Sequence, residues 1–211
     1  MILEDTPDLV FDPEPHAYVY KGAVVPSVTQ LLGTVGIPDL SKIPVENLQM
    51  GADRGRKVHM LTEYSDRGIL EEDGLSESGH AYLKLWREAR RVLGIKEWSG
   101  IEVRLYATGY AGTPDRVWID GKRGLLADIK TGTDLMAVGP QTAGYEDLIQ
   151  KNLEMKGIKR VRFERVSVKL DIEKESPIIE PLKSMSDFAV FVSAFNIYNF
   201  KKHYRVFKGG L

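Results

Sequence analysis

Two aspartates and a lysine in the middle of the chain carry the clearest chemical signal in the sequence. Asp115 belongs to the run Gly-Thr-Pro-Asp-Arg, and Asp128 and Lys130 are the ends of the run Asp-Ile-Lys. On a strand, side chains two residues apart share a face, so Asp128 and Lys130 would project together. Carboxylates bind hard divalent cations, and a fixed ammonium charge stabilises an anionic phosphate. These residue types indicate hydrolysis of a phosphodiester as the candidate chemistry.

A turn signal gives these three residues a reason to meet. The Asp-Gly pair at 120–121 favours a β-hairpin, which would place the strand after Asp115 alongside the strand of Asp128 and Lys130. Each part has a plainer alternative by itself, because Asp-x-Lys can be a solvated strand edge and Asp115 can cap a turn after proline. The hairpin favours a shared site over these alternatives.

A second set of polar residues is spaced for a helix. Gly55, His59 and Glu63 are four residues apart and would share one face of a helix predicted over about 51–66. The imidazole of His59 could bind a metal, with Glu63 orienting the ring. Gly55 would let the helix approach another backbone closely. The alternative is an ordinary surface contact between a histidine and a glutamate.

Glu102 opens a strand predicted over about 101–107. Strand alternation would place Glu102, Arg104 and Tyr106 on one face. Glu102 is then either a charge on the outer face of the sheet or a further ligand for a second metal ion. The sequence leaves these two interpretations open.

Gln141 and Tyr145 lie at the start of a helix predicted over 140–156. They are one helical turn apart and point the same way, and helix N-termini attract phosphate groups. A glutamine amide there could bind a phosphate, and a tyrosine ring could stack on a base. The alternative is an ordinary amphipathic helix.

The elements that must position these residues follow from hydrophobic periodicity and turn signals. Tyr18 and Tyr20, then Val24 and Val25, alternate around Gly22 and predict a hairpin within 8–25. The remaining pattern predicts a short helix starting in Pro26-Ser-Val-Thr, loop with short helical pieces over 34–50, helices over 51–66, 76–93, 140–156 and 186–203, and strands near 101–107, 113–119, 124–131 and 160–170. In the last helix an apolar stripe predicts core packing at Phe188, Phe191, Val192, Phe195 and Tyr198.

Composition limits the classes of protein. The chain has 211 residues, 43% of them hydrophobic, which is enough for one domain with a sizeable core. The formal net charge of −1 is mild evidence against a nucleic-acid binder. The absence of cysteine excludes disulfides, thiolate zinc sites, cysteine nucleophiles and cysteine-ligated iron–sulfur clusters. With neither a signal peptide nor a long apolar run, we expect a cytoplasmic protein (the host cytoplasm for a viral source) that does not enter a membrane.

Taken together, the motifs resemble the PD-(D/E)xK nuclease superfamily, and within it the RecB-like exonuclease branch. The likeness runs in family order across roughly 26–145. Pro26-Ser-Val-Thr resembles an N-terminal element of phage and mitochondrial members, and Gly55, His59 and Glu63 match a G-x-x-x-H-x-x-x-E helix. The remaining matches are the acidic residue that opens the core at Glu102, the motif that names the superfamily at Pro114-Asp115 and Asp128-Ile-Lys130, and the Q-x-x-x-Y motif at Gln141 and Tyr145.

This resemblance implies a role for each residue. A Mg²⁺ or Mn²⁺ site, with one or two ions, would be formed by His59, Asp115, Asp128 and the backbone carbonyl of Ile129. Lys130 would position the attacking water, and Glu102 would belong to the catalytic set. Ser27 and Thr29, with Gln141 and Tyr145, would hold the DNA strand. Some relatives carry four cysteines for an iron–sulfur cluster, which this chain cannot form.

The resemblance also implies an architecture and an activity. We expect an α/β fold with a restriction-endonuclease-like core, in which helices flank a central mixed sheet. It would be a single nuclease domain over 1–211, with an N-terminal hairpin and helical lobe (about 1–95) and a catalytic core (about 98–211). The expected activity is phage-type exonuclease cleavage of single-stranded or duplex DNA ends to 5′-phosphate and 3′-hydroxyl products, in recombination, repair or replication.

Besides DNA, a protein of recombination or replication is an expected partner of the nuclease. Two other functions fit the same motifs. One alternative is a DNA-end-binding module with a vestigial site, although such a site need not keep both aspartates and the lysine. The other is a restriction-type endonuclease, which the His59 helix and the pair Gln141 and Tyr145 disfavour. Cleavage polarity, strand preference and oligomeric state do not follow from the sequence.

Overall fold

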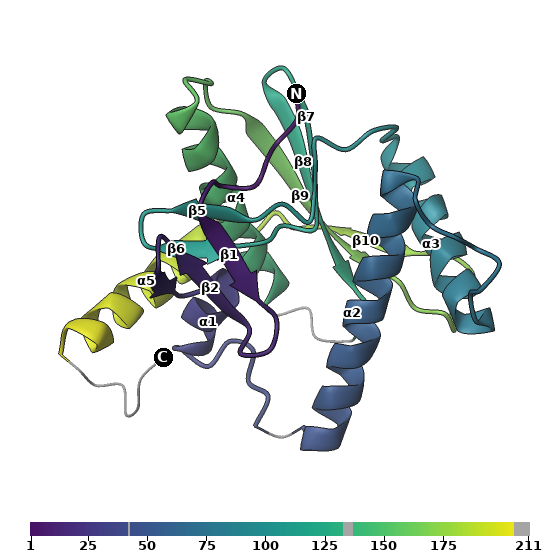
Figure 1. Ribbon diagram of the computed structural model, residues 1–211, viewed down its shortest axis with the longest axis horizontal. Helices are drawn as coiled ribbons and strands as arrows, with labels where there is room; N and C mark the ends of the chain where they lie inside the picture. The colour runs from purple at the N-terminus through teal and green to yellow at the C-terminus, as the bar shows by residue number, and fades with distance from the viewer. Residues whose placement is uncertain (42, 133–136, 205–211) are drawn as a thin grey trace.

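A five-stranded mixed sheet lies at the centre of the computed structural model, which describes residues 1–41, 43–132 and 137–204 (Figure 1). The strands are ordered β10-β9-β8-β7-β4. β8 and β9 run parallel, and the other neighbouring pairs are antiparallel. The sheet is therefore mixed, as the sequence predicts. The strands are β4 (Gly100–Ile101), β7 (Arg116–Asp120), β8 (Arg123–Lys130), β9 (Arg162–Lys169) and β10 (Ile178–Pro181).

Helices cover both faces of this sheet. On one face lie α2 (Val45–Arg67) and α3 (Glu77–Leu93), and on the other α4 (Val138–Met155) and α5 (Asp187–His203), with the short α1 (Val28–Gly33) against them (Figure 1). α4 is the crossover that joins the parallel strands β8 and β9, which is the usual way to connect parallel neighbours. No helix in the described part of the chain is long and apolar enough to cross a bilayer.

The alternation of side chains along β8 separates two cores. Leu126 packs with the core of α1, α4 and α5, whereas Leu125, Ala127 and Ile129 pack with the core of α2 and α3. Both faces of β8 are buried, which explains its near-continuous apolar run. Asp128 continues the face of Leu126, so one charged residue is placed inside the layer that α4 covers.

A smaller meander lies beside the central sheet. β1 (Leu9–Asp12), β2 (Ala17–Tyr20) and β3 (Ala23–Val25) are antiparallel, and Gly22 turns between β2 and β3 with φ +80°. The hairpin expected around Gly22 is confirmed. A two-stranded sheet of β5 (Leu105–Ala107) and β6 (Tyr110–Gly112) joins the start of α1 through a bridge between Ser27 and Ala111.

Several element boundaries differ from the predictions. The helix expected over 51–66 begins at Val45, and Gly51 lies inside it without interrupting it. The loop expected over 34–50 is correspondingly shorter. α4 begins at Val138, so Pro140 is its third residue and not its first. β10 is a further strand that the pattern did not predict. α3 agrees closely, with Ser76 as its N-cap and Gly94 as its left-handed C-cap.

The single strand expected over 101–107 is wrong, because the chain divides there into β4 and β5. Between them Glu102 has a left-handed backbone with φ +49°. The N-terminal segment takes over the pairing: Leu3 N–H donates to the Ser99 carbonyl at 2.6 Å, and Thr6 N–H to the Arg104 carbonyl at 2.8 Å. This tertiary pairing overrides local periodicity, so alternation no longer determines where Glu102 points.

Only part of the apolar stripe on α5 packs into the core. Phe191 and Tyr198 are buried, and Val192 and Phe195 are partly buried against the same core. Phe188 is 51% exposed, so its predicted core role is wrong. It lies in the first turn of α5 and lines a surface pocket beside α4.

The close packing of α1 and α5 on α4 generates a stability prediction. A Cβ at Gly144 would lie 2.7 Å from the Phe191 ring and 2.8 Å from Val28, so Gly144→Ala should lower the free energy of unfolding by about 1–3 kcal/mol. Gly51→Ala in the open part of α2 should instead raise it by up to about 1 kcal/mol. Urea unfolding of both variants tests this, and equal effects would contradict the packing described.

Candidate metal centre

Three potential metal ligands from distant parts of the sequence meet at one end of the sheet. One ligand atom each from His59, Glu102 and Asp115 lies within 4.8 Å of the others. His59 Nδ1 is 3.1 Å from Glu102 Oε1 and 3.7 Å from Asp115 Oδ1. An imidazole and two carboxylates of this kind could bind a metal ion.

The hairpin of β7 and β8 fixes the aspartate of this cluster. Asp115 lies immediately before β7, and its Oδ2 accepts a hydrogen bond of 2.6 Å from the Ile129 N–H of β8. The carbonyl of the same Ile129 lies 3.2 Å from His59 Nε2. One residue of β8 therefore holds Asp115 through its N–H and His59 through its carbonyl, which brings α2 against the end of the hairpin.

Asp128 and Lys130 share the α4 face of β8, as strand alternation predicts. The side chain of Asp128 is 1% exposed, and Lys130 Nζ lies 2.7 Å from its Oδ2. That ion pair lacks hydrogen-bond geometry, and neither Asp128 oxygen has a hydrogen-bond partner among the described residues. A buried carboxylate with free oxygen lone pairs is costly unless something coordinates it. The site therefore fits a hard cation beside Asp115 and Asp128.

Burial and the attraction between opposite charges together determine the pKa values of the cluster. Burial opposes protonation of His59, but the carboxylates of Asp115 and Glu102 outweigh it and raise the pKa of the ring to about 9. Burial, only partly offset by Lys130, raises the pKa of Asp128 to about 6, and burial also raises the pKa of Asp115. Burial opposes the charge on Lys130, but Asp128 and Asp115 outweigh it and raise its pKa, so the residue remains an ammonium.

A fully buried arginine, for which the sequence pattern predicts no role, supports the cluster. Arg116 donates from Nε to Asp66 at 2.6 Å, and from its two terminal nitrogens to Glu102 and Thr62, each at 3.0 Å. Its guanidinium carbon also lies 5.3 Å from the centre of the Trp86 ring. Arg116 thus holds Glu102 in place and ties β7 to α2 and α3. Only the three-dimensional pairing with Asp66 reveals this role.

Gln141 extends the polar network onto the first turns of α4. Its Oε1 accepts from Lys130 Nζ at 3.3 Å, and its Nε2 donates to the Tyr145 hydroxyl at 3.0 Å. The Tyr145 ring is buried against Gly112, where an added Cβ would lie 2.8 Å from Cε1. The expectation that this ring stacks on a base is therefore wrong. Its hydroxyl, through Gln141, belongs to the network of Lys130.

The structure places two further predicted residues outside the contacts of the cluster. Glu63 pairs with Arg67 at 2.9 Å, so Glu102 and not Glu63 contacts His59. At Gly55 the nearest described atom to an added Cβ is Thr131 Oγ1 at 4.0 Å, an ordinary contact. The close backbone approach expected at Gly55 is wrong for the described atoms.

The Ser-Val-Thr element has a structural role at the start of α1. Ser27 is buried and accepts from Gln30 N–H at 3.0 Å as the helix cap, and its hydroxyl lies 2.9 Å from Thr29 Oγ1. Thr29 is exposed. In the part of the chain that the structure describes, no hydrogen bond or ion pair joins either residue to the metal cluster, and their strand-binding role stays a prediction.

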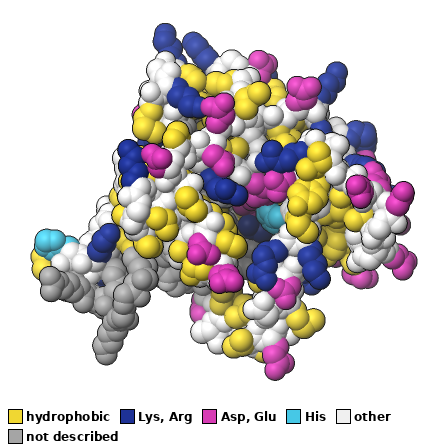
Figure 2. Space-filling view, in the orientation of Figure 1, with side chains coloured by type: hydrophobic (Ala, Val, Ile, Leu, Met, Phe, Trp, Pro, Cys, Tyr) yellow, Lys and Arg dark blue, Asp and Glu magenta, His cyan; other side chains and the backbone are white. Residues whose placement is uncertain are grey.

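The surface around the cluster combines acidic and basic side chains. Figure 2 shows a hollow beside α2 in which a histidine and acidic side chains lie, with lysine and arginine side chains around its edge. The formal net charge of the whole chain is only −1. A local basic rim of this kind can attract a polyanion although the whole chain is nearly neutral.

Comparisons with known proteins leave the family unassigned. No protein-family model matches the chain, and no curated protein matches it. Among solved structures, a crystal structure of a protein from Eubacterium rectale, named "Putative exonuclease", is similar with a TM-score of 0.43 and 13% identity, over 73% of this chain and 75% of that one. A likeness of this degree assigns neither a family nor an activity.

The Arg116 network generates a second stability prediction. Arg116→Met should lower the free energy of unfolding by about 3 kcal/mol, because it leaves Asp66 buried with only Arg90 to pair with its charge. Arg104→Met, which removes an exposed pair with Asp5, should lower it by less than about 1 kcal/mol. Urea unfolding measures both changes. Equal losses would show that the buried ion pair contributes no more to the free energy of unfolding than the exposed one.

Proton linkage generates a prediction about cation binding. The His59 ring, with a pKa of about 9, is protonated at neutral pH and must lose its proton to become a metal ligand. Below about pH 6 the Asp128 carboxyl is protonated as well and must also lose a proton when a cation binds. Mg²⁺ affinity should therefore rise by up to about tenfold per pH unit from pH 6 to 9, and more steeply below pH 6. Calorimetric titration across this range provides the measurement. An affinity that does not change with pH would place the cation elsewhere.

Proposed function

We propose that the protein is a divalent-metal-dependent deoxyribonuclease of the exonuclease type. The observation that carries the proposal is the convergence of Asp115, Asp128 and Lys130 with His59 at one end of the sheet, where Lys130 alone offsets the charge of the buried Asp128 carboxylate, whose oxygens accept no hydrogen bond from the described residues. The order of the motifs along the chain supports the same function. In this proposal residues 1–211 form a single PD-(D/E)xK nuclease domain with a restriction-endonuclease-like core.

His59, Asp115, Asp128 and the Ile129 carbonyl would hold one Mg²⁺ or Mn²⁺, and Glu102 lies within the same cluster to take part with a second ion. When bound, such an ion lowers the pKa of a coordinated water and stabilises charge on the phosphate oxygens. The remaining groups of the site are protein side chains. Their contribution is to bind and orient the phosphodiester and to hold protons at defined atoms.

Lys130 is suited to stabilise charge and not to act as a base. Its pKa is raised by the neighbouring aspartates, so it keeps its proton at neutral pH and presents a fixed positive charge. Gln141 Oε1 holds the ammonium from the α4 side, and Asp128 holds it from β8. An ammonium fixed from two sides would orient an attacking water and stabilise a developing phosphate charge without having to reorganise.

Arg116 contributes by positioning. It donates to Glu102 and to the Asp115 carbonyl at 2.8 Å, so the acidic side of the cluster is fixed by a buried cation that does not face the substrate. Gln141 stands at the start of α4, where backbone N–H groups favour a phosphate. DNA ends would therefore enter between the start of α4 and α2. As in the resemblance described above, the products would carry 5′-phosphate and 3′-hydroxyl groups.

Substitution of Lys130 tests the assignment of the site. Lys130→Met should lower the rate of DNA cleavage by at least about 10²-fold, because one preorganised positive charge is lost from the transition state. Lys122→Met, in the exposed turn of the β7–β8 hairpin, is the matched control and should leave the rate unchanged. Circular dichroism melts establish that both variants fold. Cleavage at the normal rate by folded Lys130→Met would refute the site.

The form of the DNA substrate separates the candidate functions. An exonuclease should degrade end-labelled linear DNA in the presence of Mg²⁺ or Mn²⁺ and should leave a closed circle intact. Cleavage of the circle would favour the restriction-type endonuclease. Binding of DNA ends without any cleavage, by a protein that also fails to bind Mg²⁺, would favour the end-binding module with a vestigial site.

A further inference from the structure

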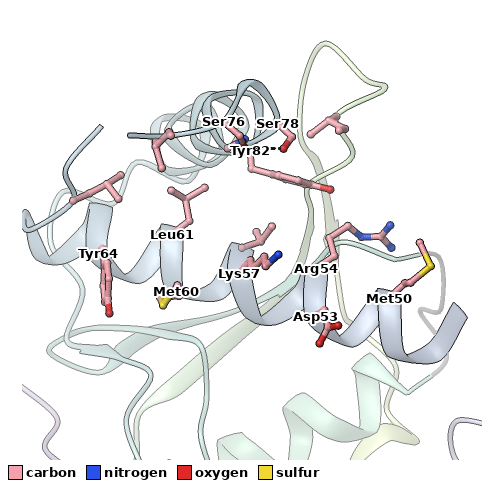
Figure 3. Close-up of a pocket in the computed structure, with 15 residues that line it drawn as sticks. Met50, Asp53, Arg54, Lys57, Met60, Leu61, Tyr64, Ser76, Ser78 and Tyr82 are labelled. Atoms are coloured by element: carbon pink, nitrogen blue, oxygen red, sulfur yellow. Dashed lines mark hydrogen bonds between the residues drawn. The ribbon is translucent and has the colours of Figure 1, made fainter. Parts of the chain in front are cut away.

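An apolar groove lies between α2 and the start of α3, away from the metal cluster. It has a volume of about 650 Å³ and opens beside the α2 residues Arg54, Lys57 and Leu61 (Figure 3). These residues are two or five positions from His59, so they lie on the opposite side of a helix with 3.6 residues per turn. One face of α2 therefore serves the metal cluster while the other lines the groove.

The floor of the groove is apolar, and its edge exposes further apolar side chains. Val58 and Leu61 are buried, whereas Met50 is 69% exposed and Met60 is 48% exposed. Grooves lined by apolar side chains and edged by polar ones often mark sites of interaction. Methionine side chains are flexible and polarizable, which suits a surface that adapts to another chain. The groove is thus built to receive apolar side chains.

The charge beside this apolar floor is positive. Arg54 and Lys57 extend from α2 at the groove (Figure 3), and no salt bridge is formed by either within the described residues. The acidic residue that lines the groove, Asp53, is already paired with Arg56 and Gln49. Two cations without acidic partners beside an apolar floor complement a ligand that carries both carboxylates and apolar side chains.

We propose that this groove binds an acidic, apolar peptide segment of a partner protein. The segment would place leucine-sized or phenylalanine-sized side chains on Val58 and Leu61 and its carboxylates against Arg54 and Lys57. A DNA strand fits less well, because bases need aromatic faces to stack on. Of the two tyrosines that line the groove, Tyr82 is only 8% exposed, and Tyr64, which is 39% exposed, points away from α3 (Figure 3). The proposal is independent of the hydrolytic function, since none of these residues belongs to the metal cluster.

Methionine NMR gives a direct measurement of where a peptide binds. The probe is a short synthetic peptide of Asp, Glu, Leu and Phe, added to the whole protein labelled with ¹³C at the methionine methyl groups. The signals of Met50 and Met60 should shift on titration. Met155 and Met185, which are exposed elsewhere, should not shift and serve as internal controls.

Charge reversal tests the role of the two cations. The double variant R54E/K57E should weaken binding of the acidic peptide by about tenfold or more, because two attractions become repulsions. The matched control K122E/R123E makes the same change of charge in the β7–β8 turn and should leave the affinity unchanged. Both variants should still cleave linear DNA, because neither changes a residue of the metal cluster, so failure of this proposal is distinguishable from failure of the nuclease function.

Three outcomes would overturn the proposal. The first is the absence of Met50 and Met60 shifts with the acidic peptide. The second is equal binding of a peptide in which Lys and Arg replace Asp and Glu, because the cations would then play no part. The third is an oligothymidylate that shifts the same methyl groups and displaces the peptide, which would make the groove a path for DNA.

Discussion

The buried contact between Arg116 and Asp66 is the constraint on which the rest of the structure depends. Both side chains are fully buried, so neither charge can be left alone without a penalty of several kcal/mol. Asp66 comes from α2 and also pairs with Arg90 of α3, while Arg116 opens β7. The pair therefore fixes two helices against the hairpin whose strands carry the candidate metal ligands. Because Arg116 follows Asp115 directly, the same contact fixes the position of the first aspartate.

The metal cluster combines a rigid frame with a local energetic cost. Asp128 is buried beside an otherwise apolar core, its oxygens have no hydrogen bonds among the described residues, and burial raises its pKa. A site that only stabilised the fold would satisfy that carboxylate with hydrogen bonds or replace it with an apolar residue. The strain is offset by two well-packed cores on either face of β8. Sites of binding and catalysis commonly depart from the best local packing in this way.

Much of this arrangement follows from the sequence because it depends on local rules. The Asp-Gly turn at 120–121 pairs β7 with β8, strand alternation places Asp128 beside Lys130, and helical spacing places Gln141 beside Tyr145. The rest depends on contacts between distant segments. The N-terminal segment divides the expected strand at Glu102, and Arg116 acquires its role from Asp66, which lies on another helix. Neither periodicity nor spacing encodes which distant residues meet, so those features required the structure.

The central claim is that the two aspartates and His59 hold a divalent cation at the end of the β7–β8 hairpin. Crystals of the protein grown with Mn²⁺ and measured at the manganese absorption edge test this claim most directly. The account predicts an anomalous peak within coordination distance of the Asp115 and Asp128 carboxylates, with His59 turned from the Ile129 carbonyl toward the ion. A well-ordered hairpin with no peak there, or a peak held by other residues, would contradict it.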